Sequence, residues 1–269
     1  MERPYRIMGV LNVTPDSFSD GGRFLDAEAA VAHGLRLEAE GAEILDVGGE
    51  STRPGAAPVP AEEQIRRVVP AIEGLVGRGA RAQLSVDTTR LEVAQAAVAA
   101  GATYVNDVSA FRHEPELAAF VADRGLDCCL SHMLGEDPRT MQADPVYDDV
   151  VSDVKAFLAE RLAAATAAGI AEERIMLDPG IGFGKTVEHN LELLRRLDEL
   201  VALGRPIVVG TSRKSFLGRL TGRAAGDRLA GTIATNVLAL ERGAAVFRVH
   251  DVAPVADALA VAAATVRGR

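Results

Sequence analysis

Residues 82–107 read AQLSVDTTRLEVAQAAVAAGATYVND and contain two short apolar runs on either side of an alanine-rich segment. The first run, Ala82 to Asp87, and the second, Tyr104 to Asp107, have the length and composition of buried strands. Between them, Leu91 to Ala100 has the spacing of a helix. Gly101-Ala102 joins that helix directly to the second strand, which is typical of a glycine C-cap at a short turn. The segment therefore predicts a strand–helix–strand unit with parallel strands.

The same order recurs along the whole chain, because each short apolar run is followed by a glycine, aspartate or asparagine cluster and then by an alanine- and leucine-rich segment. Gly41-Ala42 and Gly243-Ala244 repeat the glycine turn between helix and strand. We predict strands at Arg6 to Asn12, Glu43 to Val47, Ala82 to Asp87, Tyr104 to Asp107, Asp127 to Ser131, Ile175 to Asp178, Pro206 to Gly210 and Val246 to Val249. We predict helices at Ala27 to Glu40, Glu62 to Val76, Leu91 to Ala100, Glu116 to Arg124, Asp149 to Ala168, Asn190 to Leu203, Asp227 to Arg242 and Ala256 to Val266.

Eight units of this kind favour an α/β protein of one domain, a single-domain (β/α)8 TIM barrel over residues 1–269, because barrels of about 250 residues are routinely single domains. The apolar stripes of the helices are then expected to cover the outside of the barrel. An open doubly wound sheet is the alternative, since periodicity does not reveal whether the first and last strands pair.

Net charge and hydropathy argue against several classes of binding partner and cellular location. The formal net charge of −9 argues against a general affinity for nucleic acid or for an anionic membrane, because either partner requires a positive face. No apolar run approaches the roughly 20 residues that span a bilayer, and the N-terminus lacks the apolar core of a signal peptide. We therefore expect a cytoplasmic protein. Cys128 and Cys129 are adjacent in an apolar segment and are interpreted as core thiols.

Polar residues stand where predicted strands end. Asp87, Asn106 and Asp178 end the third, fourth and sixth strands, and the loops after the strands form the catalytic face of a barrel. One such aspartate is equally well explained as a helix N-cap. A buried carboxylate loses solvation unless donors meet it, so three acceptors together predict a ligand or partners that offer N–H groups.

Basic residues follow the later strands. Arg248 and His250 are two residues apart and point to the same side of an extended chain, which suits a clamp for phosphate oxygens. The chain has three lysines, and Lys185 and Lys214 both lie in strand-end loops, where a lysine suggests a point-charge role. Lys185 follows a glycine-rich run as in a phosphate-binding P-loop, but Pro179 stands where that pattern requires a small residue.

The other histidines, one methionine and two long loops have more than one interpretation. His33, His113 and His189 fall on or beside helices or in a loop and are expected to be structural or solvated. His132 and Met133 follow the fifth strand, where a methionine serves equally well as a core residue or as the wall of a flat apolar pocket. The long glycine-bearing loops from Asn12 to Gly22 and from Gly48 to Gly55 have the character of mobile lids.

Taken together, these segments resemble the dihydropteroate synthase family of the folate pathway, which joins a pterin pyrophosphate to 4-aminobenzoate. The resemblance spans nearly the whole chain. Its motifs are Asn12 to Gly22, Glu50 to Pro54 (ESTRP), Ser85 to Asp87 (SVD), Asn106 to Val108 (NDV), Leu177 to Lys185 (LDPGIGFGK), Ser212 to Ser215 (SRKS) and Arg248 to Asp251 (RVHD).

The resemblance implies three subsites and a dissociative reaction in which the C–O bond to pyrophosphate breaks before the amine attacks. Asp87, Asp178, Lys214 and Arg248 would be the catalytic residues. The pterin would be bound by Asp87, Asn106, Met133, Asp178, Gly210, Lys214 and Arg248. Pyrophosphate would be bound by Asn12, Thr52, Arg53, Arg248 and His250, with Mg²⁺ held through Asn12 and phosphate oxygens. The aminobenzoate pocket would contain Phe18, Thr52, Pro54, Phe183 and Ser215.

The resemblance also implies a homodimer through the late helices, where the small-residue segments Ala230 to Ala239 and Ala256 to Ala264 would allow close packing. Two rival interpretations stay open. A pterin-dependent methyltransferase would share the acceptors of the pterin edge but would not need the Ser51-Thr-Arg53 loop, the Ser212-Arg-Lys-Ser215 loop or the Arg248 and His250 clamp. A non-catalytic pterin-binding paralogue is the other rival, and pterin binding without pyrophosphate release would favour it.

Overall fold

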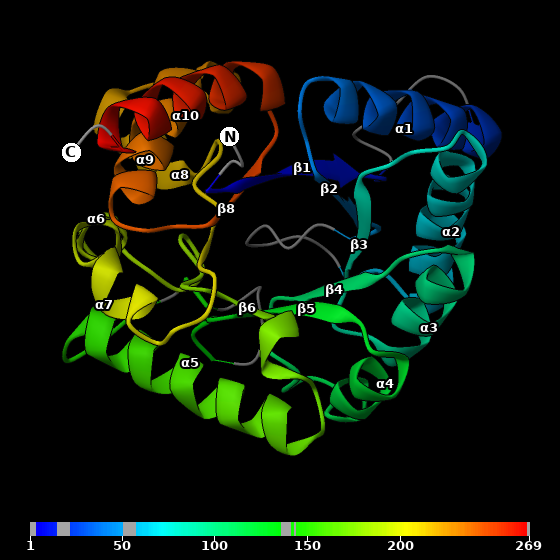
Figure 1. Ribbon diagram of the computed structural model, residues 1–269, viewed down its shortest axis with the longest axis horizontal. Helices are drawn as coiled ribbons and strands as arrows, with labels where there is room; N and C mark the ends of the chain where they lie inside the picture. The colour runs from blue at the N-terminus through cyan, green and yellow to red at the C-terminus, as the bar shows by residue number, and fades with distance from the viewer. Residues whose placement is uncertain (1–3, 15–21, 51–57, 136–140, 143, 268–269) are drawn as a thin grey trace.

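Eight short parallel strands surround the centre of the molecule, and helices surround the strands (Figure 1). The computed structural model describes residues 4–14, 22–50, 58–135, 141–142 and 144–267, with the backbone alone at residues 22–26 and 267. The strands within these ranges are β1 Arg6–Asn12, β2 Ile44–Gly48, β3 Gln83–Asp87, β4 Tyr104–Asp107, β5 Asp127–Ser131, β6 Ile175–Asp178, β7 Val208–Val209 and β8 Val246–Val249.

The two ends of the sheet meet, so the sheet closes into a barrel. Its strand order is β6-β5-β4-β3-β2-β1-β8-β7, with every pairing parallel. A parallel bridge between Leu177 and Ile207, with a 3.0 Å hydrogen bond from Leu177 N to the carbonyl of Pro206, joins β6 to the segment that enters β7. The predicted single-domain (β/α)8 TIM barrel is confirmed, and the alternative of an open doubly wound sheet is wrong.

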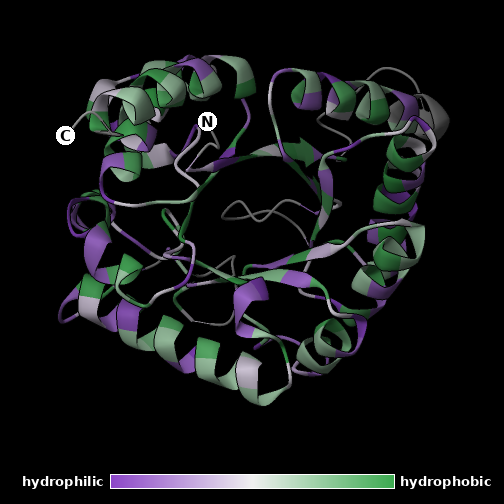
Figure 2. Ribbon diagram, in the orientation of Figure 1, coloured by the Kyte–Doolittle hydropathy of each residue, from purple (hydrophilic) through white to green (hydrophobic). Residues whose placement is uncertain are grey.

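The outer layer consists of helices that follow the strands in turn (Figure 1). They are α1 Gly22–Ala39, α2 Ala61–Gly77, α3 Leu91–Ala100, α4 Glu116–Arg124, α5 Val150–Ala167, α6 Val187–Arg195, α7 Leu197–Val201, α8 Ser215–Thr221, α9 Leu229–Glu241 and α10 Val252–Arg267, with 3₁₀ turns at Glu172–Arg174 and Ala225–Asp227. Hydrophobic and hydrophilic residues alternate along these helices (Figure 2). In the part of the chain that the structure describes, no helix combines the length and apolar character needed to cross a bilayer.

Three predictions for the helical layer need correction, and α1 and α10 begin five and four residues earlier than predicted. The helix predicted from Asn190 to Leu203 is two helices, α6 and α7, which meet at Arg196, whose guanidinium pairs with Asp149 at 2.7 Å and with Glu199 at 2.7 Å. The short helix α8 was predicted as loop, because Gly218 and Gly222 hide its helical spacing. The helix predicted to begin at Asp227 begins at Leu229, after a 3₁₀ turn.

The glycine turns form as predicted. Gly41, Gly101 and Gly243 all have positive φ, at 112°, 123° and 95°. At the end of α3, the N–H of Ala102 donates to the carbonyl of Ala97 at 3.0 Å, which satisfies one of the last carbonyls of the helix. A Cβ on Gly101 would also lie 2.7 Å from a methyl group of Val76, so packing as well as backbone conformation requires glycine here.

The barrel interior is apolar at its base. A small buried cluster fills it and comprises Met8, Ile44, Tyr104, Cys129, Met176, Val208 and Val246. Cys128 points the other way and joins the large core between the strands and the helices, so the two buried thiols lie on opposite sides of β5. Because the base is apolar, the polar residues that could bind a ligand lie at the other end of the barrel, at the carboxyl ends of the strands.

Candidate active site

Polar residues at the ends of the first four strands lie in one row. Strand register pairs Asn12 with Gly48, Gly48 with Asp87 and Asp87 with Asn106. Gly48 has no side chain that could stand between the side chains of Asn12 and Asp87. A Cβ on Gly48 would lie 3.5 Å from Asn12 Oδ1 and 3.6 Å from Asp87 Cβ. The barrel thus brings together strand-end residues that are far apart in the sequence.

Arg248 of β8 reaches across the barrel to two carboxylates. Its Nε donates to Asp46 Oδ2 at 2.7 Å and its Nη2 donates to Asp87 Oδ2 at 2.7 Å. Asp46 also accepts hydrogen bonds from Ser85 Oγ at 2.6 Å and from Asn106 Nδ2 at 3.0 Å. The side chains that end β3, β4 and β8 are therefore linked through a carboxylate from the middle of β2.

Asp46 was missed by the sequence analysis, which considered the residues at strand ends. The signal was present in the run Ile44-Leu-Asp-Val-Gly48, where a charged residue stands between apolar neighbours in a strand buried at every position. A charge placed in such a run requires a partner, since an unpaired buried charge is very costly.

Burial sets the electrostatics of this cluster. Burial raises the pKa of Asp87 to about 7, because desolvation and the neighbouring Asp46 carboxylate outweigh the attraction of Arg248. Burial alone would lower the pKa of Arg248, but Asp46 and Asp87 raise it above its usual range, so the guanidinium stays charged. The cluster holds two carboxylates against one guanidinium and favours a ligand that brings hydrogen-bond donors or positive charge.

Asp178 ends β6 and begins a tightly folded loop. Its Oδ1 accepts a 2.6 Å hydrogen bond from the N–H of Gly180. Burial raises the pKa of Asp178, although this N–H and the charges of Lys214 and Arg248 oppose the rise. Gly180 has a φ of 66°, and a Cβ on it would lie 1.7 Å from the carbonyl oxygen of His132. Glycine is thus required for the loop to pack against the end of β5.

The same loop presents an aromatic ring to a lysine from the next strand end. Lys214 Nζ lies 3.8 Å from the centroid of the Phe183 ring. Phe183 packs in turn against a buried cluster that contains Met133, Val108 and Met141. Met133 is therefore a buried residue of the apolar cluster behind Phe183, as the core alternative predicted, and its role as a pocket wall stays a prediction.

Lys185 is buried beneath this loop. Its Nζ lies 2.8 Å from His132 Nδ1 and donates to the carbonyl of Phe183 at 3.0 Å. Burial lowers the pKa of Lys185 to about 7 and that of His132 to about 2, so His132 is neutral near pH 7 and its Nδ1 can accept a hydrogen bond from Lys185 Nζ. These contacts are internal to the fold, in agreement with the rejection of a P-loop at this position.

The loops after β7 and β8 contact each other through side chains. Gly210 follows β7 beside Arg248 of β8, and a Cβ on it would make only an ordinary van der Waals contact, 4.0 Å from Arg248 Cβ. Ser212 Oγ lies 3.0 Å from His250 Nδ1. Arg213 has a φ of 59°, a strained value for a residue with a side chain, and its Nη2 contacts Asp251 Oδ1 at 2.6 Å. This ion pair holds the turn that places Lys214 over Phe183, and Ser215 follows as the exposed first residue of α8.

Ten predicted site residues thus lie around the carboxyl ends of the strands: Asn12, Asp87, Asn106, Met133, Asp178, Phe183, Gly210, Lys214, Arg248 and His250. Ser215 follows Lys214 in the chain and is exposed. Phe18, Thr52, Arg53 and Pro54 lie outside the described residues.

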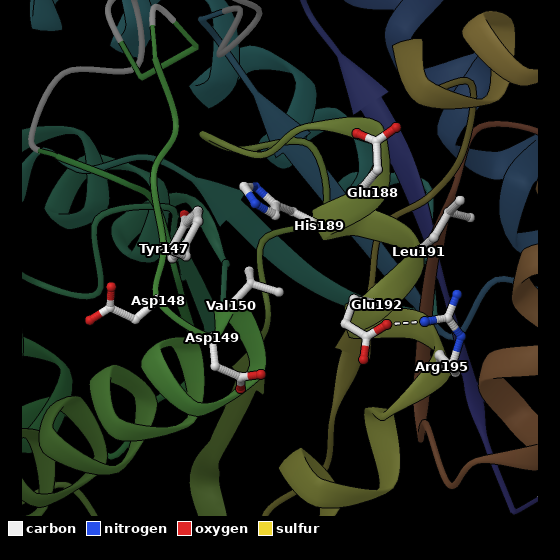
Figure 3. A pocket seen from close by; sticks show the side chains of 9 residues that line it. All are labelled: Tyr147, Asp148, Asp149, Val150, Glu188, His189, Leu191, Glu192 and Arg195. Atoms are coloured by element: carbon white, nitrogen blue, oxygen red, sulfur yellow. Dashed lines mark hydrogen bonds and ion pairs between the residues drawn. The ribbon is translucent and has the colours of Figure 1, made fainter.

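A surface pocket lies elsewhere, between the start of α5 and α6 (Figure 3), and it is lined by Tyr147, Asp148, Asp149, Val150, Glu188, His189, Leu191, Glu192 and Arg195. None of the predicted site residues lines it. Asp149 Oδ1 accepts from Ser152 N at 2.8 Å as the N-cap of α5, and His189 completes the capping box of α6. The polar groups of this pocket thus stabilise helix ends, and the structural role predicted for His189 is confirmed.

The chain is similar to known proteins along nearly its whole length. Residues 8–250 match the pterin binding enzyme family. The dihydropteroate synthase of Escherichia coli strain K12 is 45% identical over 263 residues, which cover 98% of this chain and 92% of that protein.

Solved structures agree with the sequence comparison. A dihydropteroate synthase of Xanthomonas albilineans solved with 4-aminobenzoic acid superimposes with a TM-score of 0.91 at 52% identity, covering 98% of this chain and 93% of that one. The structure of the Xanthomonas albilineans protein in complex with 7,8-dihydropteroate gives a TM-score of 0.88 at 50% identity, covering 98% and 94%. From its fold, its strand-end motifs and these relatives, the chain belongs to the pterin binding enzymes and, among them, to the dihydropteroate synthase family.

Proposed function

We propose that this chain condenses 6-hydroxymethyl-7,8-dihydropterin pyrophosphate with 4-aminobenzoate to form 7,8-dihydropteroate and pyrophosphate. The observation that carries the proposal is the group of acceptors Asp87, Asn106 and Asp178 on the catalytic face of the barrel, of which Asn106 and Asp178 are buried and Asp87 has a side chain 13% exposed. The pyrimidine edge of a pterin offers adjacent N–H groups, which are the partners that buried acceptors require.

The pterin would lie above the apolar base of the barrel. Asp178 would accept from the pyrimidine N–H groups, with Asn106 and Asp87 completing the edge. Lys214 would donate to a ring acceptor, and Arg248 would stack its guanidinium on the face of the pterin. Met133 and Gly210 would complete the walls. A site that pairs each polar atom of a heterocycle rejects mismatched analogues strongly, because a mismatch leaves buried groups unpaired.

Pyrophosphate would lie toward the barrel mouth, near Asn12, Arg248 and His250, with Thr52 and Arg53 supplied by the loop after β2. The donor set fits a Mg²⁺ ion that is held mainly by the substrate: in the described part of the chain no three His, Cys, Asp or Glu side chains form a metal site, and Mg²⁺ commonly takes few protein ligands beside phosphate oxygens. Asn12 would supply the protein oxygen. When bound, Mg²⁺ would neutralise charge that develops on the pyrophosphate.

The reaction would proceed through a pterin cation. The C–O bond breaks, its electron pair leaves with pyrophosphate, and positive charge develops on the exocyclic carbon and the pterin ring. Asp87 and Asp178 stabilise that cation, while Arg53 and His250 stabilise the leaving group; one such preorganised contact is typically worth about 3 to 4 kcal/mol. The amine of 4-aminobenzoate then attacks the carbon and loses a proton. This scheme requires no covalent nucleophile.

The aminobenzoate would bind at the mouth of the barrel between Phe183 and Ser215, with Phe18, Thr52 and Pro54 contributed by the two long loops. Phe183 is suited to this role because its ring is partly buried against Met133 and is held by Lys214. The aromatic ring of 4-aminobenzoate would thereby be held so that its amine lies beside the exocyclic carbon that the amine attacks.

The proposal extends to assembly and location. We expect a cytoplasmic homodimer without nucleic-acid or membrane partners. The helices α9 and α10 pack side by side and expose Leu238 and Val261, which are 50% and 70% accessible. Sedimentation equilibrium tests this part: a dimer that dissociates in Leu238→Glu or Val261→Glu supports the expected interface, and a monomeric wild type contradicts it.

The reaction is tested by measuring pyrophosphate release from the dihydropterin pyrophosphate with Mg²⁺, with and without 4-aminobenzoate. We expect release coupled to formation of dihydropteroate, and loss of both in Asp178→Asn. In that variant one oxygen can still accept from the N–H of Gly180, so the loop is preserved while the ligand meets an NH₂ group. Pterin binding without release would favour the non-catalytic paralogue, and methyl transfer from a reduced folate would favour the methyltransferase.

A further inference from the structure

We infer that Asp46 is a positioning residue for substrate specificity: it fixes the amide of Asn106 and the guanidinium of Arg248 so that the barrel presents hydrogen-bond acceptors to the pterin edge. The inference rests on the proposed function. It assigns a role to a carboxylate that is fully buried, so Asp46 acts through the residues it holds.

Three donors from three strands converge on this carboxylate. Ser85 Oγ of β3 donates to Oδ1 at 2.6 Å, while Asn106 Nδ2 of β4 and Arg248 Nε of β8 both donate to Oδ2, at 3.0 and 2.7 Å. Because Ser85 holds one oxygen and the other two donors hold the second, the carboxylate cannot rotate without losing a contact. A side chain in the middle of β2 thereby sets the geometry of two residues at strand ends.

The contact with Asn106 decides what that residue can offer a ligand. The nitrogen and oxygen of an amide point in different directions, so a nitrogen turned toward Asp46 leaves the oxygen turned away from it. The reverse orientation would place the amide oxygen about 3 Å from a carboxylate oxygen, where two acceptors repel. Asn106 is therefore held as an acceptor, like Asp87 and Asp178, and a heterocycle edge that offers N–H groups is favoured over one that offers an acceptor.

The contact with Arg248 sets the plane of the guanidinium. Arg248 Nε donates to Asp46 and Arg248 Nη2 donates to Asp87. Carboxylates from β2 and β3 therefore hold two of the three guanidinium nitrogens. Among the described residues, no partner is found for the third nitrogen of this guanidinium, Nη1. Nη1 can therefore donate to an anion. Since the guanidinium is planar, these two contacts also determine which ring plane can stack on it.

The test compares two substitutions of similar size. Asp46→Leu removes every acceptor, whereas Asp46→Asn can keep its oxygen toward Arg248 and Asn106 and turn its NH₂ toward Ser85 Oγ, which can accept. We expect Asp46→Leu to raise KM for the dihydropterin pyrophosphate by about 10- to 100-fold, the range that a lost charged hydrogen bond produces. KM for 4-aminobenzoate should change less than about threefold, and Asp46→Asn should recover most of the loss.

A double-mutant cycle separates positioning from general damage to the fold. If Asp46 acts through Asn106, then Asn106→Ala raises the pterin KM much less in the Asp46→Leu background than in wild type. Asp127→Leu is the matched control, because Asp127 at the other end of the barrel also accepts from an amide, Gln83 Nε2 at 2.7 Å, and from an arginine, Arg174 Nη1 at 3.0 Å. We expect its pterin KM to equal that of wild type.

Additive effects in the cycle, or equal increases in both KM values, would overturn the inference. If Asp46→Leu does not fold, Ser85→Ala carries the test: it removes the donor that holds Oδ1 of the same carboxylate, and a pterin KM that stays unchanged in this variant contradicts the assigned role. A wild-type protein that forms no dihydropteroate would instead refute the proposed function, so the two failures are distinguishable.

Discussion

Asp87→Asn is expected to stabilise the folded protein at alkaline pH while it impairs catalysis. The pKa of Asp87 is raised from 3.8 to about 7, so the folded state holds a proton that the unfolded state has already lost. The contribution of Asp87 to the unfolding free energy of the wild type therefore falls as the pH rises from 3.8. It stops falling near pH 7, where Asp87 ionises in the folded state as well. Asparagine carries no such proton, and its oxygen can still accept from Arg248.

The size of the effect follows from the pH range. Between pH 5 and about 7, the difference of roughly 2 pH units corresponds to about 3 kcal/mol at about 1.4 kcal/mol per unit. Asp46 shares Arg248 with Asp87, so the guanidinium relaxes toward Asp46 in the variant and part of the gain is lost. We expect the unfolding free energy of Asp87→Asn, relative to wild type, to increase by about 2 kcal/mol between pH 5 and pH 8.5.

Urea unfolding at the two pH values measures this difference, followed by far-ultraviolet circular dichroism because the chain contains no tryptophan. Asp123→Asn, which removes an exposed carboxylate from α4, is the control and should stay within about 0.5 kcal/mol of wild type at both pH values. A difference for Asp87→Asn that is the same at pH 5 and pH 8.5 would refute the reasoning, since the ionisation of Asp87 would then cost the folded state nothing.

Three further outcomes follow from the loops and helix ends. Gly180→Ala should destabilise the protein by about 3 kcal/mol or more in urea unfolding, because its Cβ would lie 1.7 Å from the carbonyl of His132; Gly79→Ala, at a similar φ of 74° but in open space, should cost only about 1 to 2 kcal/mol. Arg248→Lys should lower kcat/KM for the pterin substrate by at least about 100-fold in steady-state assays, because one ammonium cannot replace the two-pronged contact; a loss below tenfold would contradict this. Thr186→Ala should cost about 1 kcal/mol in thermal unfolding, since it removes the N-cap of α6, and should leave kcat unchanged.

Local pattern was enough to place most elements of the barrel. Strands β1, β4, β5, β6 and β8 have the predicted bounds, and helices α3 and α4 match as well. These segments are short apolar runs or periodic segments bounded by glycine or polar residues, and such signals act over only a few neighbours. The break at Arg196 was not visible in this way, because it depends on ion pairs that include Asp149, 47 residues away.

The candidate site was predicted in part for the same reason. A polar residue that ends an apolar run is recognisable in the sequence, and Asp87, Asn106, Asp178 and Arg248 were found by that rule. Asp46 is in the interior of its run, and its partners come from three other strands, one of them 202 residues away. The internal role of Lys185 was likewise undetermined until its contact with His132, 53 residues away, was known.

The sequence by itself thus determined the order and type of most elements, the repeated strand–helix units that favour a barrel, and most of the polar residues at the ends of its strands. The tertiary structure alone decided that the sheet closes through Leu177 and Ile207, and that Asp46 links Asn106 with Arg248. The physical reason is the range of the interactions. Helix and strand propensities depend on near neighbours in the chain, whereas closure and side-chain networks depend on strand order, register and tilt, which arise only when distant segments pack together.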